Sequence, residues 1–387
     1  MFISLRTLVL VLLLMVIPVT GHAQNNSKTI VMRIMAVQGE GMAYVRQLRQ
    51  LQKNIEERTH GQIAVELLIN GVGGSEADAL KNQTNGTVEG GWISGLAMAQ
   101  TFRAFRALML PLVFNDIEQI NSFIDSPLDQ TVRSTTLSKN LLVLGYGSYG
   151  FYGIMFFDTR VPTNGHNEGN ALEIMRDRTV LVPGDQWVEA VQGSLPGKVK
   201  RTPGLGLKQV IDAGGGEGLL VTPEMVSNTV WTGKASHFLN LRHLHGWSVF
   251  SVNRVWFETL SAKHQQIVKQ EVRAMCQRAL SSGLTFHDTL VQKWYSKRQP
   301  MVVQASWDRM AAMEEGLVKK TSLELEGFLA SKGRIRLLWE ANYRLIPPPN
   351  SPIPIRNSSV SSNFFPDDRG VLANVMNMNL PGEFGEP

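Results

Sequence analysis

Residues that could carry out catalysis are present in this chain, but they lack the partners that catalysis needs. Segments 70–75 (NGVGGS) and 214–218 (GGGEG) are glycine-rich, yet neither is followed by the Gly-Lys-Ser/Thr sequence of a nucleotide-binding loop. Ser148 lies in the sequence YGSYG, where the first glycine is displaced by one residue from the Gly-x-Ser-x-Gly pattern of a nucleophile elbow. We therefore expect no catalytic residues and no nucleotide cofactor.

Three histidines, His237, His243 and His245, lie close together in the sequence. His243 and His245 would share one face of a strand, a geometry that can bind zinc. No acidic or cysteine partner lies near them in the sequence. We expect ordinary buried or surface histidines and no metal.

Aromatic residues indicate where a small molecule could bind. Several are predicted to lie near strand ends or helix starts, where ligand crevices form in α/β sheets. They are Trp92, Phe151, Tyr152, Trp187 and Trp231. Large rings beside a few polar groups suit a small-molecule site, and the alternative is that these rings are ordinary core residues.

The amino terminus is typical of a secretory signal peptide. Arg6 precedes an apolar run over residues 8–17, and Gly21-His22-Ala23 provides the small residues that a signal peptidase reads. The run is shorter than the roughly 20 residues that span a bilayer. We expect cleavage before Gln24 and a periplasmic protein, the alternative being an uncleaved anchor.

Composition excludes some classes of function. The formal net charge is +5, but the basic residues are scattered rather than interleaved with aromatic rings, so we expect no nucleic-acid partner. Cys276 is the only cysteine, which leaves stability to packed cores rather than to a disulfide. A reactive role for Cys276 is the alternative to a small buried hydrophobe.

Hydrophobic periodicity predicts alternating strands and helices, the pattern of a parallel α/β sheet. The first unit is a strand at 29–37, a helix at 42–59 and a strand at 62–69. Further predicted strands are 86–93, 141–146, 178–183, 219–222 and 246–255, and further helices are 76–84, 185–192, 205–213, 261–281, 286–295 and 307–330. From Pro347 the chain is rich in Pro, Ser and Asn, typical of an extended tail.

The segment Leu110–Asp129 (LPLVFNDIEQINSFIDSPLD) connects an apolar run to a helix that Asp116 can cap. It resembles a segment typical of the solute-binding proteins of TRAP-type (tripartite ATP-independent periplasmic) transporters, the DctP-like family. The resemblance extends from Ile30 to about Ala279 through a collinear set of segments. These are 57–61 (ERTHG), 73–76 (GGSE), 178–183, 214–223 and 256–261 (WFETLS).

The resemblance implies a two-domain periplasmic-binding-protein-like α/β fold with an interdomain cleft and a helical C-terminal section. It also implies a small organic solute and the inner-membrane permease subunits of a TRAP transporter as partners, with no enzymatic activity. The expected division is a signal peptide (1–23), the first part of domain I (24–150), domain II (151–245), a return strand and helices partly completing domain I (246–346), and a tail (347–387).

The chain departs from the family where a ligand carboxylate is usually held. In the strand that reads Lys-Ile-Arg-Val-Pro in family members, Leu181 occupies the arginine position, and Tyr152 aligns with a second frequent arginine. A bidentate arginine matches a carboxylate, and burying a carboxylate without its cation is unfavourable. Thr222 matches the polar position before a family proline.

We therefore hypothesise a neutral or more apolar ligand held by Tyr152, Trp92, Trp187 and Leu181, rather than a simple carboxylate. Phe151 and Thr222 complete the expected site with Glu76, which either contacts the ligand or is a simple first-turn helix charge. Arg160 or Arg178 could supply the missing cation. Two alternative functions stay open, a periplasmic scaffold that kept the fold and an extracytoplasmic enzyme.

Overall fold

A single mixed β-sheet crosses the molecule in the computed structural model, which describes residues 29–40, 42–109, 114, 116–157, 174–183, 197–202, 207–227, 231–297 and 300–304. The strands follow the order β2-β1-β3-β8-β4-β7-β5-β6, with β9 pairing with β8. They are β1 (Ile30–Met35), β2 (Ile63–Leu68), β3 (Gly90–Ser94), β4 (Leu141–Phe156), β5 (Thr179–Pro183), β6 (Lys198–Thr202), β7 (Gly218–Val221), β8 (His237–Asn253) and β9 (Met301–Gln304).

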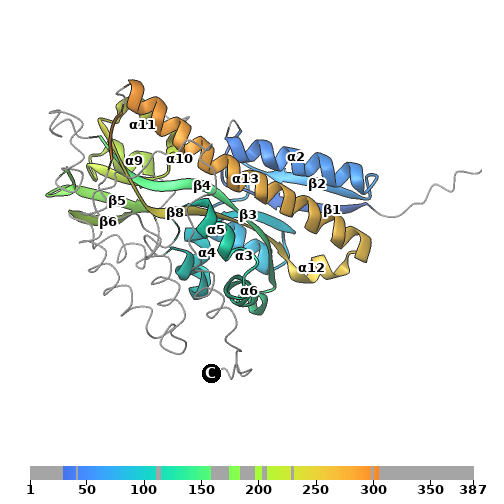
Figure 1. The fold of residues 1–387 in the computed structure, drawn as a ribbon. Helices are drawn as coiled ribbons and strands as arrows, with labels where there is room; N and C mark the ends of the chain where they lie inside the picture. Colours follow the sequence, from blue (N-terminus) through green and yellow to red (C-terminus); the bar gives the residue numbers. More distant parts are fainter. Residues whose placement is uncertain are drawn as a thin grey trace, which may run out of the picture.

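Helices cover both faces of this sheet (Figure 1). In chain order the α-helices are α2 (Ala43–Arg58), α3 (Glu76–Thr84), α4 (Gly95–Thr101), α5 (Ile117–Phe123), α6 (Pro127–Ser134), α9 (Leu207–Asp212), α10 (Pro223–Val226), α11 (Trp231–Lys234), α12 (Arg254–Thr259) and α13 (Ala262–Lys297). The α/β class and the helical section after β8 are confirmed. None of the described helices is long and apolar enough to span a membrane.

The first strand–helix–strand unit is formed as the sequence predicts. β1 and β2 pair in parallel, from Ile30 opposite Ile63 to Met35 opposite Leu68, with α2 as the crossover. Val45, Leu48, Leu51 and Ile55, spaced at helical intervals on α2, are fully buried. Burial of this apolar stripe is what holds the helix on the sheet.

The long antiparallel strands β4 and β8 join the two halves of the sheet. Near one end β8 pairs with β3, and near the other end β4 pairs with β7, so both halves share the same two strands. The predicted strand 141–146 stops before Gly147 and the predicted strand 246–255 begins at Gly246, but β4 and β8 continue through these glycines. Gly150 has a positive φ of 82° and marks one of three register shifts instead of an end.

Helix α13 is one continuous helix of 36 residues, where two helices, 261–281 and 286–295, were predicted. It runs along β4 and beside α2 (Figure 1). A Cβ on Gly283 would collide with the carbonyl oxygen of Ser148 in β4. The Ser-Ser-Gly sequence at 281–283 is therefore a point of close approach to the sheet and not a helix end.

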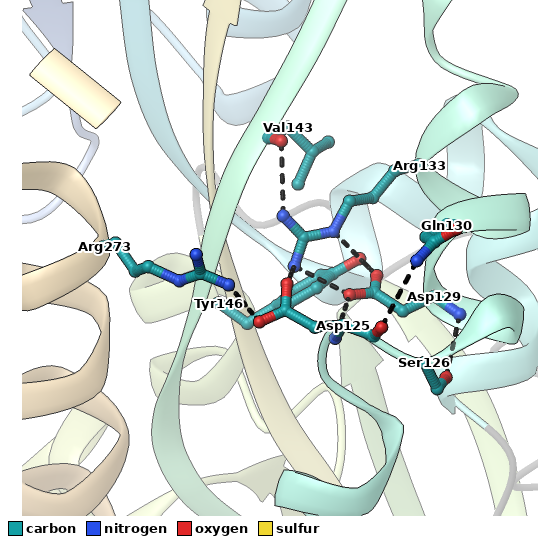
Figure 2. A network of polar contacts seen from close by, with 8 residues as sticks. All are labelled: Asp125, Ser126, Asp129, Gln130, Arg133, Val143, Tyr146 and Arg273. Atoms are coloured by element: carbon teal, nitrogen blue, oxygen red, sulfur yellow. Dashed lines mark hydrogen bonds and ion pairs between the residues drawn. The ribbon is translucent and has the colours of Figure 1, made fainter. Parts of the chain in front are cut away.

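A buried ion pair anchors α6 to the sheet (Figure 2). The carboxylate of Asp129, which is fully buried, binds Arg133 through Nε at 2.8 Å and Nη2 at 2.7 Å. It also accepts hydrogen bonds from the Tyr146 hydroxyl at 2.6 Å and the Asp125 amide at 2.8 Å. Arg273 of α13 pairs with Asp125 at the exposed end of this network. Every oxygen of the buried carboxylate is thus partnered, as burial of a charge requires.

The predicted cap at the start of α5 is confirmed, since the Asp116 carboxylate accepts from the Gln119 amide at 2.8 Å. Residues 110–113 and 115 of the same segment lie outside the described residues. So do the predicted helices 185–192 and 307–330 and the tail from Pro347.

Replacing Arg133 with methionine should destabilise the protein by about 3–5 kcal/mol, because it leaves the buried Asp129 carboxylate without its cation. The matched change Arg273→Met removes an exposed cation and should cost less than about 1 kcal/mol. Urea unfolding of both variants measures the difference. Equal losses would contradict the assignment of Asp129–Arg133 as the structural pair.

Replacing Gly283 with alanine should destabilise by about 1–3 kcal/mol, because the new methyl group forces α13 away from β4. The control is Gly233→Ala in α11, where a Cβ meets nothing within 4 Å. Alanine there should be neutral or stabilising by up to about 1 kcal/mol through helix propensity. Thermal unfolding measures both effects: the unfolding temperature should fall for Gly283→Ala and stay the same or rise for Gly233→Ala. An unchanged unfolding temperature for Gly283→Ala would refute the close packing of α13 on β4.

Candidate functional site

Buried polar and aromatic side chains gather where parallel strands from both halves of the sheet reach their carboxyl ends. Trp92 lies on β3, and Tyr44 and Glu76 begin the helices that follow β1 and β2. Glu224 follows β7 on α10, and Tyr149 lies on the shared strand β4. We call these five residues the Trp92–Glu224 cluster. Carboxyl ends of parallel strands are where α/β proteins bind ligands.

Three aromatic rings form the centre of the cluster. The rings of Tyr44 and Trp92 are parallel within 2°, with centroids 6.5 Å apart. Tyr44 meets Tyr149 edge to face at 5.4 Å, and Trp92 meets Phe250 in the same way at 6.0 Å. All four rings are buried, and together they form a rigid aromatic surface contributed by α2, β3, β4 and β8.

Glu76 is held in place by the start of the next helix. Its carboxylate accepts hydrogen bonds from the Ser94 amide at 2.8 Å and the Ser94 hydroxyl at 2.5 Å. Ser94 is itself the cap of α4, accepting from the Ala97 amide. Burial raises the pKa of Glu76, and the bonds from Ser94 and from the Gln38 side chain oppose that rise. Glu76 is thus a fixed acceptor at the edge of the cluster rather than a free first-turn charge.

Glu224 is, with Tyr44 and Tyr149, one of the three residues of this cluster that the sequence does not predict. It is 4% exposed, and the Ala43 amide at the start of α2 donates a hydrogen bond to it across the two halves. Within the part of the chain that the structure describes, its Oε1 atom has no hydrogen-bond partner. Burial raises the pKa of Glu224 to about 7, opposed by the Ala43 amide and the positive charge of Arg46. The signal available was Thr222-Pro223-Glu224, an acidic residue in the first turn of a short helix after a strand.

Other polar atoms of the region are also buried without a partner. They include the Tyr149 hydroxyl, the Trp92 indole nitrogen and the Gln38 Oε1 atom. Burial raises the pKa of Tyr149, followed by the negative charges of Tyr44, Glu76 and Glu224, and the indole N–H of Trp92 opposes this rise. Burial also raises the pKa of Tyr44, followed by the charges of Glu224 and Glu76. Trp92 and Tyr149 are therefore close, but no well-aligned hydrogen bond joins them. The five residues are therefore close enough for the two carboxylates and the indole to affect the pKa values of the tyrosines.

Of the predicted site residues, the structure brings together Glu76, Trp92 and Tyr152. Tyr152 is buried on β4, and its pKa is raised by burial and then by the charge of Glu76. Thr222 is fully buried and caps α10, accepting from the Met225 amide at 3.4 Å. Thr222 lies two residues before Glu224 in the sequence, and its side chain serves as the cap of α10.

Phe151 and Leu181 lie in other environments. Phe151 packs between the rings of His245 and His287, and the Arg242 guanidinium lies 4.1 Å from its ring centroid. Leu181 belongs to an apolar core that contains Leu219. Arg178 contacts the Ile174 carbonyl oxygen and lies over the Phe156 ring. Trp187 and Arg160 lie outside the described residues.

Ser148 and His245 form a nucleophile–base pair that the YGSYG sequence only suggested. The Ser148 hydroxyl lies 2.8 Å from His245 Nε2 and also accepts from the Gly150 amide. Both residues are buried, and His245 Nδ1 has no partner, so the acid that orients a catalytic histidine is lacking among the described residues. Burial and then the charge of Arg242 lower the pKa of His245 to about 3. The pair lies within the packed sheet as a core contact.

The histidines that could have held zinc are buried on β8. Burial lowers the pKa of His243 to about 4. Within the part of the chain that the structure describes, no group of three or more His, Cys, Asp or Glu residues could hold a metal ion. Cys276 is buried against the sheet, and burial raises the pKa of its thiol.

The structure thus shows a mixed α/β sheet with buried polar and aromatic side chains gathered at the carboxyl ends of its parallel strands. Residues 36–182 match the family model described as bacterial extracellular solute-binding protein, family 7 (DctP). The matched residues make up less than half of the chain, and over them the chain is similar to this extracellular solute-binding family. No curated protein matches the chain.

Solved structures of TRAP periplasmic solute-binding proteins share this fold. One from Ochrobactrum anthropi has a TM-score of 0.70 at 17% identity, over 83% of this chain and 98% of that one. One from Sulfitobacter sp. NAS-14.1 with bound β-D-galacturonate has a TM-score of 0.69 at 19% identity, over 82% and 100%. One from Desulfovibrio salexigens with bound orotic acid has a TM-score of 0.71 at 13% identity, over 82% and 100%.

Replacing Glu224 with glutamine should remove a pH-dependent part of the stability. The pKa of about 7 in the folded protein lies above the ordinary glutamate pKa of 4.5, so the folded state holds this proton more tightly than the unfolded state. Stability from this group is therefore complete below pH 4.5 and is lost as the pH rises towards 7.

Between pH 5 and pH 8, the unfolding free energy of the wild type should fall relative to Glu224→Gln by about 2–3 kcal/mol. Urea unfolding of both proteins across this range measures the difference, and the subtraction removes the contribution of Glu76. A difference that does not change with pH would show that Glu224 titrates normally.

Proposed function

We propose that this protein is a periplasmic receptor that binds one small organic solute at the Trp92–Glu224 cluster and delivers it to the membrane permease of a TRAP transporter, without catalysis. The observation that carries this proposal is the set of buried, unpartnered polar atoms contributed by both halves of the sheet. Glu224 Oε1 comes from the β7 half, Trp92 Nε1 from the β3 half and the Tyr149 hydroxyl from the shared strand.

Unpartnered buried groups are costly, and native proteins keep few of them. Each costs about 1–3 kcal/mol when it lacks a hydrogen bond. A bound solute that forms hydrogen bonds with these groups would remove this cost, so the closed protein would be more stable with the solute than without it. A site of this kind would hold the solute tightly and close around it, as the hinged binding proteins do.

The same residues argue against a simple carboxylate held by the usual arginine. Leu181 and Tyr152 stand where family members place arginine, and Leu181 packs in an apolar core. The cluster already contains two carboxylates, those of Glu76 and Glu224. The acids bound by the Sulfitobacter and Desulfovibrio proteins are therefore poor guides to the ligand of this one.

The cellular setting completes the proposal. The amino-terminal segment is proposed to be a signal peptide over 1–23, so that the mature chain begins at Gln24 in the periplasm. Domain I then comprises 24–150 with part of 246–346, domain II is 151–245, and 347–387 forms a tail. The shared strands β4 and β8 would connect the two domains.

Protein purified from its host under mild conditions should carry one small molecule per chain in native mass spectrometry. Glu224→Gln should lose this mass, because it changes an atom that the ligand contacts. The matched Glu258→Gln, at a glutamate whose side chain is 60% exposed on α12, should keep it. A wild type without bound mass, and with no rise in unfolding temperature on adding host extract, would contradict the proposal.

A further inference from the structure

We infer that the ligand is an organic cation, a compound with an ammonium group and a hydrogen-bond acceptor, held by Glu76, Glu224 and the aromatic rings between them. This inference rests on the proposed function and names the chemical class of the solute. It follows from the kinds of groups at the Trp92–Glu224 cluster and from those that have no partner.

The charges of the cluster favour a positive group. Glu76 and Glu224 are the cluster's two acidic side chains, and both are close enough to Tyr44 and Tyr149 to raise the pKa of each phenol. Arg46, the cation that affects Glu224, is an exposed residue of α2, and it leaves Oε1 of Glu224 without a hydrogen bond. An ammonium group beside Oε1 would offset the cost of burying this carboxylate.

The rings reinforce this preference. The ring centroid of Tyr44 lies 6.5 Å from that of Trp92 and 5.4 Å from that of Tyr149, and the charges of Glu76 and Glu224 act on both tyrosines. Aromatic faces attract cations, and tryptophan does so most strongly. Rings combined with carboxylates are a poor environment for an anion and a good one for an alkylated ammonium group.

The indole N–H of Trp92 indicates a second group of the ligand, a hydrogen-bond acceptor. Trp92 Nε1 is buried and donates to no well-aligned acceptor. An indole N–H is a donor only, so its partner must be an acceptor such as a hydroxyl or carbonyl oxygen. An ammonium group would balance the negative charge of Glu224, and a hydroxyl near it would accept a hydrogen bond from Trp92 Nε1.

The ionisation of Glu224 links binding of a cation to pH. The groups that set its pKa of about 7 are its burial, the Ala43 amide and Arg46. Tyr149 of β4 and Glu76 of α3 face the same cluster. Helix α13 packs against α10 and carries His287 and Asp288, and Asp288 pairs with Arg242 of β8. These three residues are not among the groups that shift the pKa of Glu224. A cation binds the ionised form, so binding should release a proton and tighten as the pH rises.

Isothermal titration of the mature protein with choline, 3,3-dimethylbutan-1-ol and succinate tests this inference. Choline is the cation, the alcohol is its neutral counterpart of the same shape, and succinate is the carboxylate. Choline should bind at least tenfold more tightly than the alcohol, and succinate should not bind. From pH 6 to pH 8 the dissociation constant for choline should fall about tenfold, because the ionised fraction of Glu224 rises by that factor.

Glu224→Gln should abolish this pH dependence and weaken choline binding, whereas Glu258→Gln should leave both unchanged. Equal binding of choline and the alcohol, or binding of succinate alone, would overturn the cationic ligand and leave the solute-binding function standing. If none of the three probes binds but the protein carries a host solute, the mass of that solute decides: a solute without a cationic group overturns the inference. If no probe binds and the protein carries no host solute, both the cationic ligand and the solute-binding function are overturned.

Discussion

The antiparallel pairing of β4 with β8 is the interaction on which the rest of the structure depends. Both halves of the sheet are built onto these two strands, one through β3 and the other through β7. Any change in the angle between the halves must be absorbed within this pair and within α13, which packs along β4. Register shifts at Ser148/Phe151 and Tyr152/Ile154, with the positive φ of Gly150, are where the ladder is weakest. They lie next to Tyr149, so bending there would act directly on the site.

Two buried carboxylates differ in how far the chain satisfies them. Asp129 is surrounded by Arg133, the Tyr146 hydroxyl and the Asp125 amide, and both of its oxygens are partnered (Figure 2). Among the groups that affect the pKa of Glu224, the Ala43 amide is the one hydrogen-bond donor, and within the described residues Oε1 of Glu224 has no partner. We propose that Asp129 stabilises the fold and that Glu224 binds the solute, because a buried charge needs a partner and that of Glu224 is incomplete.

Much of the fold could be predicted from the sequence, because helix and strand periodicities reflect burial directly. The unit from β1 to β2, the helix α3 and the cap at Asp116 are formed as expected. The errors came from glycine: those in β4 and at Gly283 were read as ends, although close packing of α13 on the sheet requires them. The cluster that we propose as the binding site is predicted only in part. The positions of Trp92 and Glu76 at strand and helix ends indicate these two residues, but Tyr44, Tyr149 and Glu224 converge only through pairing of distant strands, which one sequence cannot show.

A crystal structure of the protein purified from its host tests the central claim most directly. The claim predicts density for one small molecule in contact with Glu224 Oε1, Trp92 Nε1 and the Tyr149 hydroxyl, each then partnered. Density at another place, with these three atoms partnered by the chain itself, would contradict it.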